Sequence, residues 1–222
     1  MRLRLIVFDV DGTLVDSRRE ICAAMRRAYG DLGLAPPADT AILSIVGLSL
    51  PQALHRLGPE LDEARRAALA AGYRAHFARL RDSGALPPLY PGMRALLDAL
   101  AGQDHTLLGI ATGKSRRGLD ALLEAHGLDG RFFTMQVADD HPSKPHPAML
   151  RAALAQTGVE AARAVMIGDT EYDMEMARMA GLSGLGVRWG YHDAARLRAA
   201  GARDVLRDAT ALTRALEELA DE

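Results

Sequence analysis

The sequence of 222 residues predicts an α/β fold, in which a doubly wound parallel sheet carries a separate helical insertion. Three observations lead to this prediction. Short apolar runs rich in valine and isoleucine recur along the chain, as buried parallel strands do. Stretches with apolar residues at three- and four-residue spacing lie between these runs, which indicates alternating strands and helices. One interval, from Asp16 to Pro88, breaks this alternation because it holds helical patterns and no convincing strand.

The predicted core elements alternate in chain order. The expected strands are Leu3–Asp9, Thr106–Ala111, Phe132–Ala138, Ala164–Gly168 and Gly184–Val187. The expected core helices are Met93–Ala101, Gly118–His126, Pro147–Gln156 and Tyr172–Ala180. Such βαβ units form a parallel sheet that is covered on both faces, and we expect the Rossmann-like strand order 3-2-1-4-5.

The interval from Asp16 to Pro88 is much longer than a crossover between parallel strands requires. Its helical patterns are Arg18–Leu32, Pro51–Leu57 and Leu61–Leu80. We therefore expect an inserted helical cap domain at residues 16–88, and a core domain formed by residues 1–15 and 89–222. The alternative is that the extra helices pack directly on the core.

Composition limits the partners of the protein. Hydrophobic residues make up 49% of the chain, which is enough for a sizeable core, and the formal net charge is -2. This balance gives no electrostatic footprint for nucleic acid or an anionic membrane, so we expect a small-molecule partner. The apolar run before Asp9 is too short for a signal peptide or a membrane span. We expect a cytoplasmic monomer or homodimer, and the single Cys22 excludes a disulfide within the chain.

Unusual polar residues follow the predicted strands at their carboxyl ends. They are Asp9 and Asp11 after the first strand, Thr112 and Gly113 after the second, Lys144 after the third, and Asp169 and Asp173 after the fourth. Ligands of open α/β sheets bind beyond the carboxyl ends of the strands, where the strand order reverses. The first, second and fourth strands are neighbours at that point, so we expect these side chains to converge there.

The residue types at this point define a chemistry. Several carboxylates close together stay ionised only beside a cation, and oxygen ligands favour Mg²⁺. A threonine hydroxyl, backbone N–H groups and a lysine ammonium suit the oxygens of a phosphate. One carboxylate can attack phosphorus, and a second can serve as general acid and then as general base. The cluster therefore predicts phosphoryl transfer from a small phosphorylated metabolite.

The segment Asp9-Val10-Asp11-Gly12-Thr13 resembles the first motif of the haloacid dehalogenase superfamily in its phosphatase form. Thr112, Lys144 and the segment from Gly168 to Asp173 resemble its second, third and fourth motifs, in the expected order and across nearly the whole chain. Each motif is weak alone, but the ordered set is specific. The position of the insertion is similar to that of the helical, C1-type cap in the phosphoglycolate phosphatase-like branch.

This resemblance implies a role for each residue of the cluster. Asp9 is implied to be the nucleophile and a Mg²⁺ ligand, and Asp11 is implied to be the general acid/base, with its backbone carbonyl as a further ligand. Thr112 and the N–H of Gly113 are implied to bind phosphate, and Lys144 is implied to neutralise phosphate and orient Asp9. Asp169 is implied to be a metal ligand, and Asp173 to support the metal through water or from just outside its ligands. The cap is implied to close over the substrate.

Several single residues have alternative interpretations. Lys114 could be an exposed lysine at the start of a helix, or it could replace Lys144 as the lysine that neutralises phosphate. Thr112 could also cap the helix that follows it, and Asp173 could serve as a local cap or ion-pair partner. The segment Gly113-Lys114-Ser115 lacks the upstream glycine of a P-loop, which disfavours a nucleotide switch.

Three functions compete at this stage. The first is hydrolysis of a small phosphomonoester such as phosphoglycolate or a sugar phosphate, the second is a phosphomutase of similar fold, and the third is a non-catalytic phosphate-binding relative. The intact set of nucleophile and metal-binding residues favours the first. The sequence does not identify the substrate, and the cap candidates for specificity are Arg19, Gly47, Leu48 and Ser49.

Overall fold

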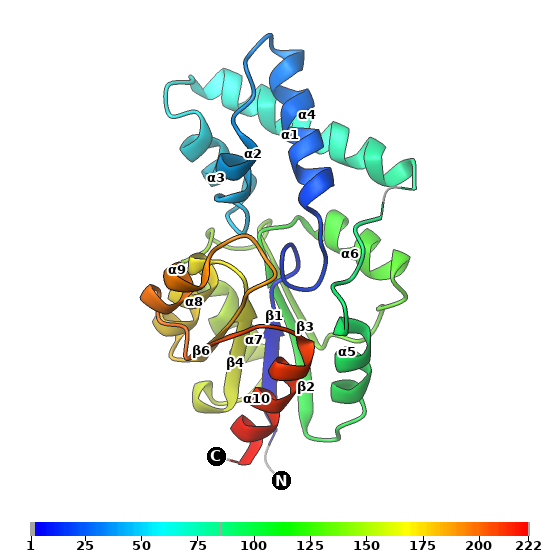
Figure 1. The fold of residues 1–222 in the computed structure, drawn as a ribbon, viewed down its shortest axis with the longest axis vertical. Helices are drawn as coiled ribbons and strands as arrows, with labels where there is room; N and C mark the ends of the chain where they lie inside the picture. The colour runs from blue at the N-terminus through cyan, green and yellow to red at the C-terminus, as the bar shows by residue number, and fades with distance from the viewer. Residues whose placement is uncertain (1–2, 85, 222) are drawn as a thin grey trace.

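The computed structural model describes residues 3–84 and 86–221, and within them six strands form one parallel sheet (Figure 1). In the order in which they lie across the sheet, the strands are β3 (Thr134–Val137), β2 (Thr106–Thr112), β1 (Arg4–Phe8), β4 (Ala164–Gly168), β5 (Ser183–Val187) and β6 (Asp204–Leu206). This arrangement confirms the predicted doubly wound α/β fold and the strand order 3-2-1-4-5. The structure adds β6 at the edge of the sheet, which the sequence pattern did not reveal.

The first strand lies at the centre of the sheet, between β2 and β4. Phe8 at its end is opposite Ile110 of β2 and Ile167 of β4. Because the three strands run parallel, the chain leaves all of them at the same edge of the sheet. The register therefore brings the residues that follow Phe8 close to those at the ends of β2 and β4.

Helices cover both faces of the sheet, as βαβ units require. One face carries α5 (Met93–Ala101), α6 (Arg116–Ala125) and α10 (Ala209–Asp221), and the other carries α7 (Ala148–Thr157) and α8 (Glu171–Ala180), with the 3-10 turn η1 (Ala161–Arg163) before β4 and α9 (Ala194–Ala199) beside α8. The four predicted core helices are all present, with ends shifted by at most two residues. Helices α9 and α10 were not predicted.

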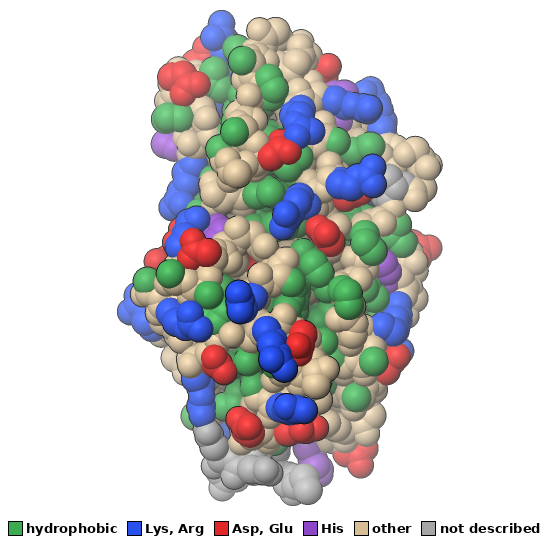
Figure 2. Space-filling view, viewed as in Figure 1, with side chains coloured by type: hydrophobic (Ala, Val, Ile, Leu, Met, Phe, Trp, Pro, Cys, Tyr) green, Lys and Arg blue, Asp and Glu red, His purple; other side chains and the backbone are tan. Residues whose placement is uncertain are grey.

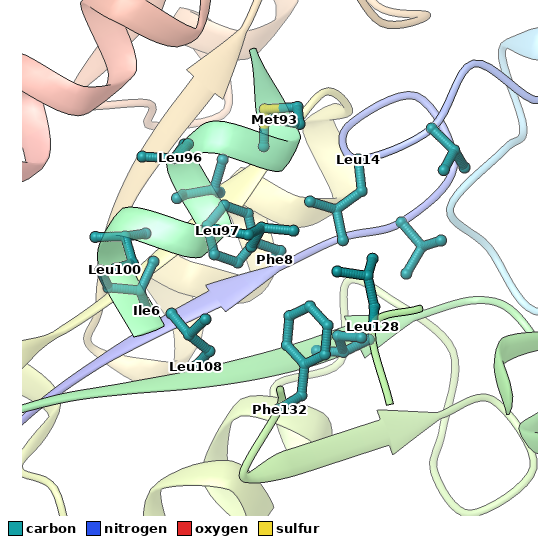
Figure 3. Close-up of a cluster of buried hydrophobic side chains, with 14 of the residues drawn as sticks. Ile6, Phe8, Leu14, Met93, Leu96, Leu97, Leu100, Leu108, Leu128 and Phe132 are labelled. Carbon is teal, nitrogen blue, oxygen red and sulfur yellow. The ribbon is translucent and has the colours of Figure 1, made fainter. Parts of the chain in front are cut away.

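The larger part of the core lies on the face of the sheet that carries α5, α6 and α10. Figure 3 shows Leu97 of α5 packed near Phe8 of β1, with Leu100 near Ile6 and Leu108 of β2 on the adjacent strand. Phe8 and Leu97 are fully buried. Burial of a large apolar side chain contributes about 1.5–3 kcal/mol, so this packing fixes β1 firmly. The acidic turn that begins at Asp9 therefore starts from a rigid strand.

Four helices lie together beyond the carboxyl end of the sheet, at the top of the molecule in Figure 1. They are α1 (Arg18–Asp31), α2 (Asp39–Leu43), α3 (Leu50–Leu57) and α4 (Glu63–Asp82), of which α2 was not predicted. They bury an apolar cluster of their own, which includes Cys22, Met25 and Leu69. The chain thus carries the helical cap expected after the first strand, and the domain limits at residues 16 and 88 stay a prediction.

The two connections between cap and core run side by side. The N–H of Asp16 donates to the carbonyl of Pro88 at 2.9 Å, and the N–H of Tyr90 donates to the carbonyl of Leu14 at 2.9 Å. Val15 forms an isolated antiparallel bridge with Leu89 between these two bonds. A paired connection of this kind is a geometry about which a cap can rotate as a body.

The surface agrees with the near-zero net charge. Figure 2 shows one face of the molecule, on which Lys and Arg side chains are interspersed with Asp and Glu side chains. This face therefore lacks the contiguous basic patch that nucleic-acid binding requires. Among the described residues, no helix combines the length and the apolar character needed to cross a membrane.

Candidate active site

Three buried carboxylates meet at the carboxyl end of the sheet. Asp9 directly follows β1, Asp169 directly follows β4, and Asp173 lies in the first turn of α8. One oxygen from each lies within 4.8 Å of the others, and their exposed fractions are 1%, 0% and 0%. The N–H of Asp9 donates to the carbonyl of Ile167 at 2.9 Å, which continues the β1–β4 pairing into the cluster. The sheet thus brings together residues that are far apart in sequence.

Lys144 is the cation within this cluster. Its ammonium lies 2.9 Å from Asp9 Oδ1 and 2.6 Å from Asp173 Oδ1, and its exposed fraction is 1%. Burial by itself lowers the pKa of a lysine, but the charges of Asp173 and Asp9 outweigh it and raise the pKa of Lys144. Lys144 therefore stays charged. With three ionised carboxylates and one ammonium, the cluster would carry two uncompensated negative charges.

The pKa values of the carboxylates respond to this excess. Burial raises the pKa of Asp9 to about 7 against the opposing charge of Lys144, and the neighbouring charge of Asp173 adds to the rise. Burial, together with the charges of Asp9 and Asp173, holds the pKa of Asp169 well above its usual range. Apart from the ion pair with Lys144, neither oxygen of Asp9 has a polar partner among the described residues. Buried carboxylates in this state are suited to hold a metal ion.

A tight turn brings the chain after β1 against Asp169. Gly12 adopts a left-handed conformation with φ +89°, and a Cβ at this position would lie 2.2 Å from Asp169 Oδ2. Only glycine fits this turn. The hydroxyl of Thr13 then donates to Asp169 Oδ1 at 2.9 Å, and the N–H of Tyr191 donates to Oδ2 at 2.8 Å. These two donors fix the orientation of the Asp169 carboxylate.

Asp11 lies apart from the three carboxylates, at the wall of a cavity below the cap. Its carboxylate accepts two hydrogen bonds from the ammonium of Lys114, at 2.9 and 2.8 Å, and one from the hydroxyl of Ser17 at 2.6 Å. The expectation of an exposed Lys114 is therefore wrong, because its side chain is 11% exposed and is paired with Asp11. The same geometry places Lys144, and not Lys114, beside Asp9.

The end of β2 contributes Thr112 and Gly113 to the same cavity. Thr112 is 1% exposed, and it does not cap the following helix, because Ser115 accepts the capping bond from the N–H of Gly118. Asp173, by contrast, acts both as a local cap and as an ion-pair partner. Its Oδ2 accepts from the N–H and the hydroxyl of Thr170 at 3.1 and 2.7 Å, while its Oδ1 faces Lys144.

A cavity of about 390 Å³ separates the cap from these core residues. Asp9, Asp11 and Thr112 lie on its core side. Of the four residues proposed from sequence as cap candidates for specificity, Gly47, Leu48 and Ser49 line the cavity, whereas Arg19 is not among the described lining residues. The cavity thus lies where the acidic cluster opens toward the cap.

The cap contacts the core around this cavity. The N–H of Ser49 donates to the hydroxyl of Ser143 at 2.8 Å, and the hydroxyl of Tyr172 donates to the carbonyl of Ser44 at 3.0 Å. A Cβ at Gly113 would lie 2.6 Å from the carbonyl oxygen of Leu48, so glycine is needed for this close approach. With these contacts in place, the cap is closed over the core.

The structure thus combines an acidic cluster at the switch point of a doubly wound sheet with a cavity under a helical cap, as the resemblance to the haloacid dehalogenase superfamily implies. A family model described as haloacid dehalogenase-like hydrolase matches residues 6–187, and the chain belongs to this family. The resemblance seen in the four sequence motifs is thereby confirmed, as is the prediction of a hydrolase.

Named relatives cover most of the chain. It is 38% identical to a "probable phosphatase IndB" of Dickeya dadantii, over 88% of this chain and 86% of the relative. It is 34% identical to a phosphoglycolate phosphatase of Rhodospirillum rubrum, over 85% of this chain and 80% of the relative. The structure of a hydrolase from Pseudomonas syringae superposes with a TM-score of 0.86 and 28% identity, over 97% of this chain and 98% of that one.

Proposed function

We propose that the chain is a Mg²⁺-dependent phosphatase that hydrolyses a small phosphomonoester through an aspartyl-phosphate on Asp9. The observation that carries this proposal is the Asp9 carboxylate itself, which is buried at the cavity wall and has Lys144 beside Oδ1 as its ion-pair partner but no hydrogen-bond partner for Oδ2 among the described residues. Such a carboxylate is costly unless a cation and a substrate complete its surroundings. The phosphatase names of two relatives support the same reaction.

The donor set fits Mg²⁺, because all of its atoms are oxygens and Mg²⁺ is bound by one or two carboxylates together with water and phosphate oxygens. We assign the side chains of Asp9 and Asp169 and the backbone carbonyl of Asp11 as ligands. Asp173 has a supporting position, because its oxygens already face Thr170 and Lys144. When bound, the ion would offset the buried negative charge and polarise the phosphoryl oxygens.

The residues divide the two chemical steps between them. An oxygen of Asp9 attacks phosphorus while the bond to the leaving oxygen breaks, and Asp11 donates a proton to that oxygen. Water then attacks phosphorus, Asp11 accepts its proton, and the bond between phosphorus and Asp9 breaks to release phosphate. Thr112, the N–H of Gly113 and Lys144 bind the phosphoryl oxygens, and the closed cap limits the entry of bulk water.

Phosphate release from a panel of phosphomonoesters, including phosphoglycolate and sugar phosphates, tests the proposal. We expect release with Mg²⁺, and loss of release with EDTA or after Asp9→Asn. Activity that persists under either condition contradicts the mechanism. Isomerisation of a sugar phosphate without phosphate release would instead indicate a phosphomutase. Binding of phosphate esters without turnover of any of them would indicate a non-catalytic relative.

A further inference from the structure

The cap side of the cavity combines an apolar wall with two arginines of α4, Arg74 and Arg81. The apolar residues that line it include Met25 of α1, Ile45 before α3, Leu50 of α3, and Tyr73 and Phe77 of α4. Within the part of the chain that the structure describes, the acidic residues that line the cavity all come from the core, and none comes from the cap. Met25, Tyr73 and Phe77 also belong to or pack against the apolar cluster of the cap, and the surface that they leave toward the cavity is placed to contact a ligand.

Two aromatic rings of this wall are linked to the proton-transfer group Asp11 through Lys114. Tyr73 and Phe77 are one turn apart on α4, with ring centroids separated by 5.8 Å. The ammonium of Lys114 lies 4.9 Å from the centroid of Phe77, and the same ammonium is paired with Asp11. The proposed function has Asp11 deliver a proton to the leaving oxygen. A leaving group at that position therefore extends from Asp11 toward the two rings.

The size of the cavity also favours a substrate larger than a two-carbon phosphate ester. Its volume of about 390 Å³ lies within the range of ~300–1,000 Å³ typical of pockets that hold drug-sized ligands. A phosphate joined to a two-carbon acid is much smaller than such a ligand and would leave part of the cavity unfilled. Burial of a ring against this wall would remove apolar surface from water on both partners.

We propose that the substrate is a phosphomonoester whose leaving group carries an apolar, ring-bearing body that packs on Tyr73 and Phe77. This inference rests on the proposed phosphatase function and specifies its substrate class. The phosphate occupies the core side of the cavity, and the ring occupies the cap side. Specificity then comes from apolar burial under the closed cap.

The test compares kcat/KM for 2-phenylethyl phosphate, ethyl phosphate and phosphoglycolate, because all three are unactivated primary alkyl esters. We expect 2-phenylethyl phosphate to exceed both of the others by about tenfold or more, as the burial of one ring implies. A ratio near one for the two simple esters, or phosphoglycolate as the best of the three, overturns the inference and leaves the phosphatase function standing. No phosphate release from any ester with Mg²⁺ overturns the function as well.

Variants locate the preference on the cap. Phe77→Ala should reduce the kcat/KM ratio of 2-phenylethyl to ethyl phosphate several-fold, and Phe77→Leu, which keeps an apolar side chain and the cap core, should reduce it less. Phe133→Ala is the matched control, because Phe133 is 55% exposed and lies outside the cavity. A ratio that stays at the parent value in both variants overturns the inference. If Phe77→Ala proves unstable, an unchanged ratio in Phe77→Leu overturns it.

Discussion

The ammonium of Lys114 lies within 2.9 Å of both carboxylate oxygens of Asp11, although the two residues are 103 positions apart in the chain. Ser17 donates a third hydrogen bond to the same carboxylate. This arrangement holds the Asp11 side chain at the cavity wall, facing the position of a leaving group. It also couples Asp11 to the cap, because Lys114 lies over the ring of Phe77.

Lys114→Met removes the paired cation and should lower kcat/KM. A hydrogen bond to a charged group contributes about 1.5–3 kcal/mol, which corresponds to roughly 10- to 100-fold in rate. The matched comparison is Arg117→Met, which removes another cation of the cavity lining that forms no hydrogen bond or ion pair with Asp11 in the described structure, and it should have a much smaller effect. Equal losses in the two variants would show that general electrostatics, and not the orientation of Asp11, accounts for the change.

Metal-free protein should lose stability as the pH rises. The pKa of Asp9 is about 7 in the folded state and 3.8 when unperturbed, so between about pH 4 and pH 7 the folded state binds more protons than the unfolded chain. The free energy of unfolding therefore falls through this window. Because Mg²⁺ requires ionised carboxylates, its addition should raise the Tm more at pH 8 than at pH 5.5. Thermal unfolding with EDTA and with Mg²⁺ at both pH values measures this.

Asp9→Asn isolates the contribution of the cluster to this behaviour. Removal of one buried charge should make the metal-free protein more stable than the parent at pH 8, and should largely abolish the rise in Tm caused by Mg²⁺. Asp104→Asn removes an exposed charge outside the site and should leave the Mg²⁺ response intact. A full Mg²⁺ response in Asp9→Asn would place the metal elsewhere.

Gly113→Ala should prevent the cap from closing. The new Cβ would lie 2.6 Å from the carbonyl oxygen of Leu48 and 2.7 Å from that of Gly47, and neither backbone atom can move without displacing the cap. We expect a loss in kcat/KM of about tenfold or more, consistent with the sensitivity of catalysis to small misplacements. Gly102→Ala is the control, because its nearest neighbour would be at 3.6 Å. Equal kinetics for the two variants would contradict a closed cap in turnover.

Tyr172→Phe should weaken the docking of the cap on α8. The Tyr172 hydroxyl donates to the carbonyl of Ser44 and accepts from Arg56 at 2.8 Å, and a net loss of about 1 kcal/mol predicts a KM increase of roughly fivefold. Tyr29→Phe removes a buried cap hydroxyl that has no hydrogen-bond partner among the described residues, and it should leave KM unchanged. Steady-state kinetics of the two variants separates docking from general cap stability.

The sequence predicts the long core elements well, because their apolar periodicity is set by burial on the sheet. The elements that the sequence does not predict are short or lie at the edge of the sheet. Strand β6 has three residues and α2 has five, too few for a periodic pattern. Helix α10 differs, since Leu212 and Leu216 are buried at four-residue spacing, which is a pattern that indicates a helix.

The sequence predicts the site only in part, for a related reason. The positions of Asp9, Thr112 and Asp169 follow from the topology of parallel strands, because each one follows or ends a neighbouring strand. The pairing of Lys114 with Asp11 depends on side-chain directions that no spacing encodes. The same holds for Tyr191, whose N–H contacts Asp169 from a loop 22 residues further along the chain. Contacts of this kind come from tertiary packing alone.

The central claim is that the phosphoryl group is transferred to Asp9. Borohydride reduces an acyl phosphate on aspartate to homoserine, and peptide mass spectrometry locates the product. During turnover of a phosphomonoester with Mg²⁺, we predict homoserine at position 9, and none when substrate is omitted or Asp9→Asn is used. Trapping at another residue, or rapid turnover with no trapped product under conditions that trap a known aspartyl-phosphate enzyme, would contradict the account.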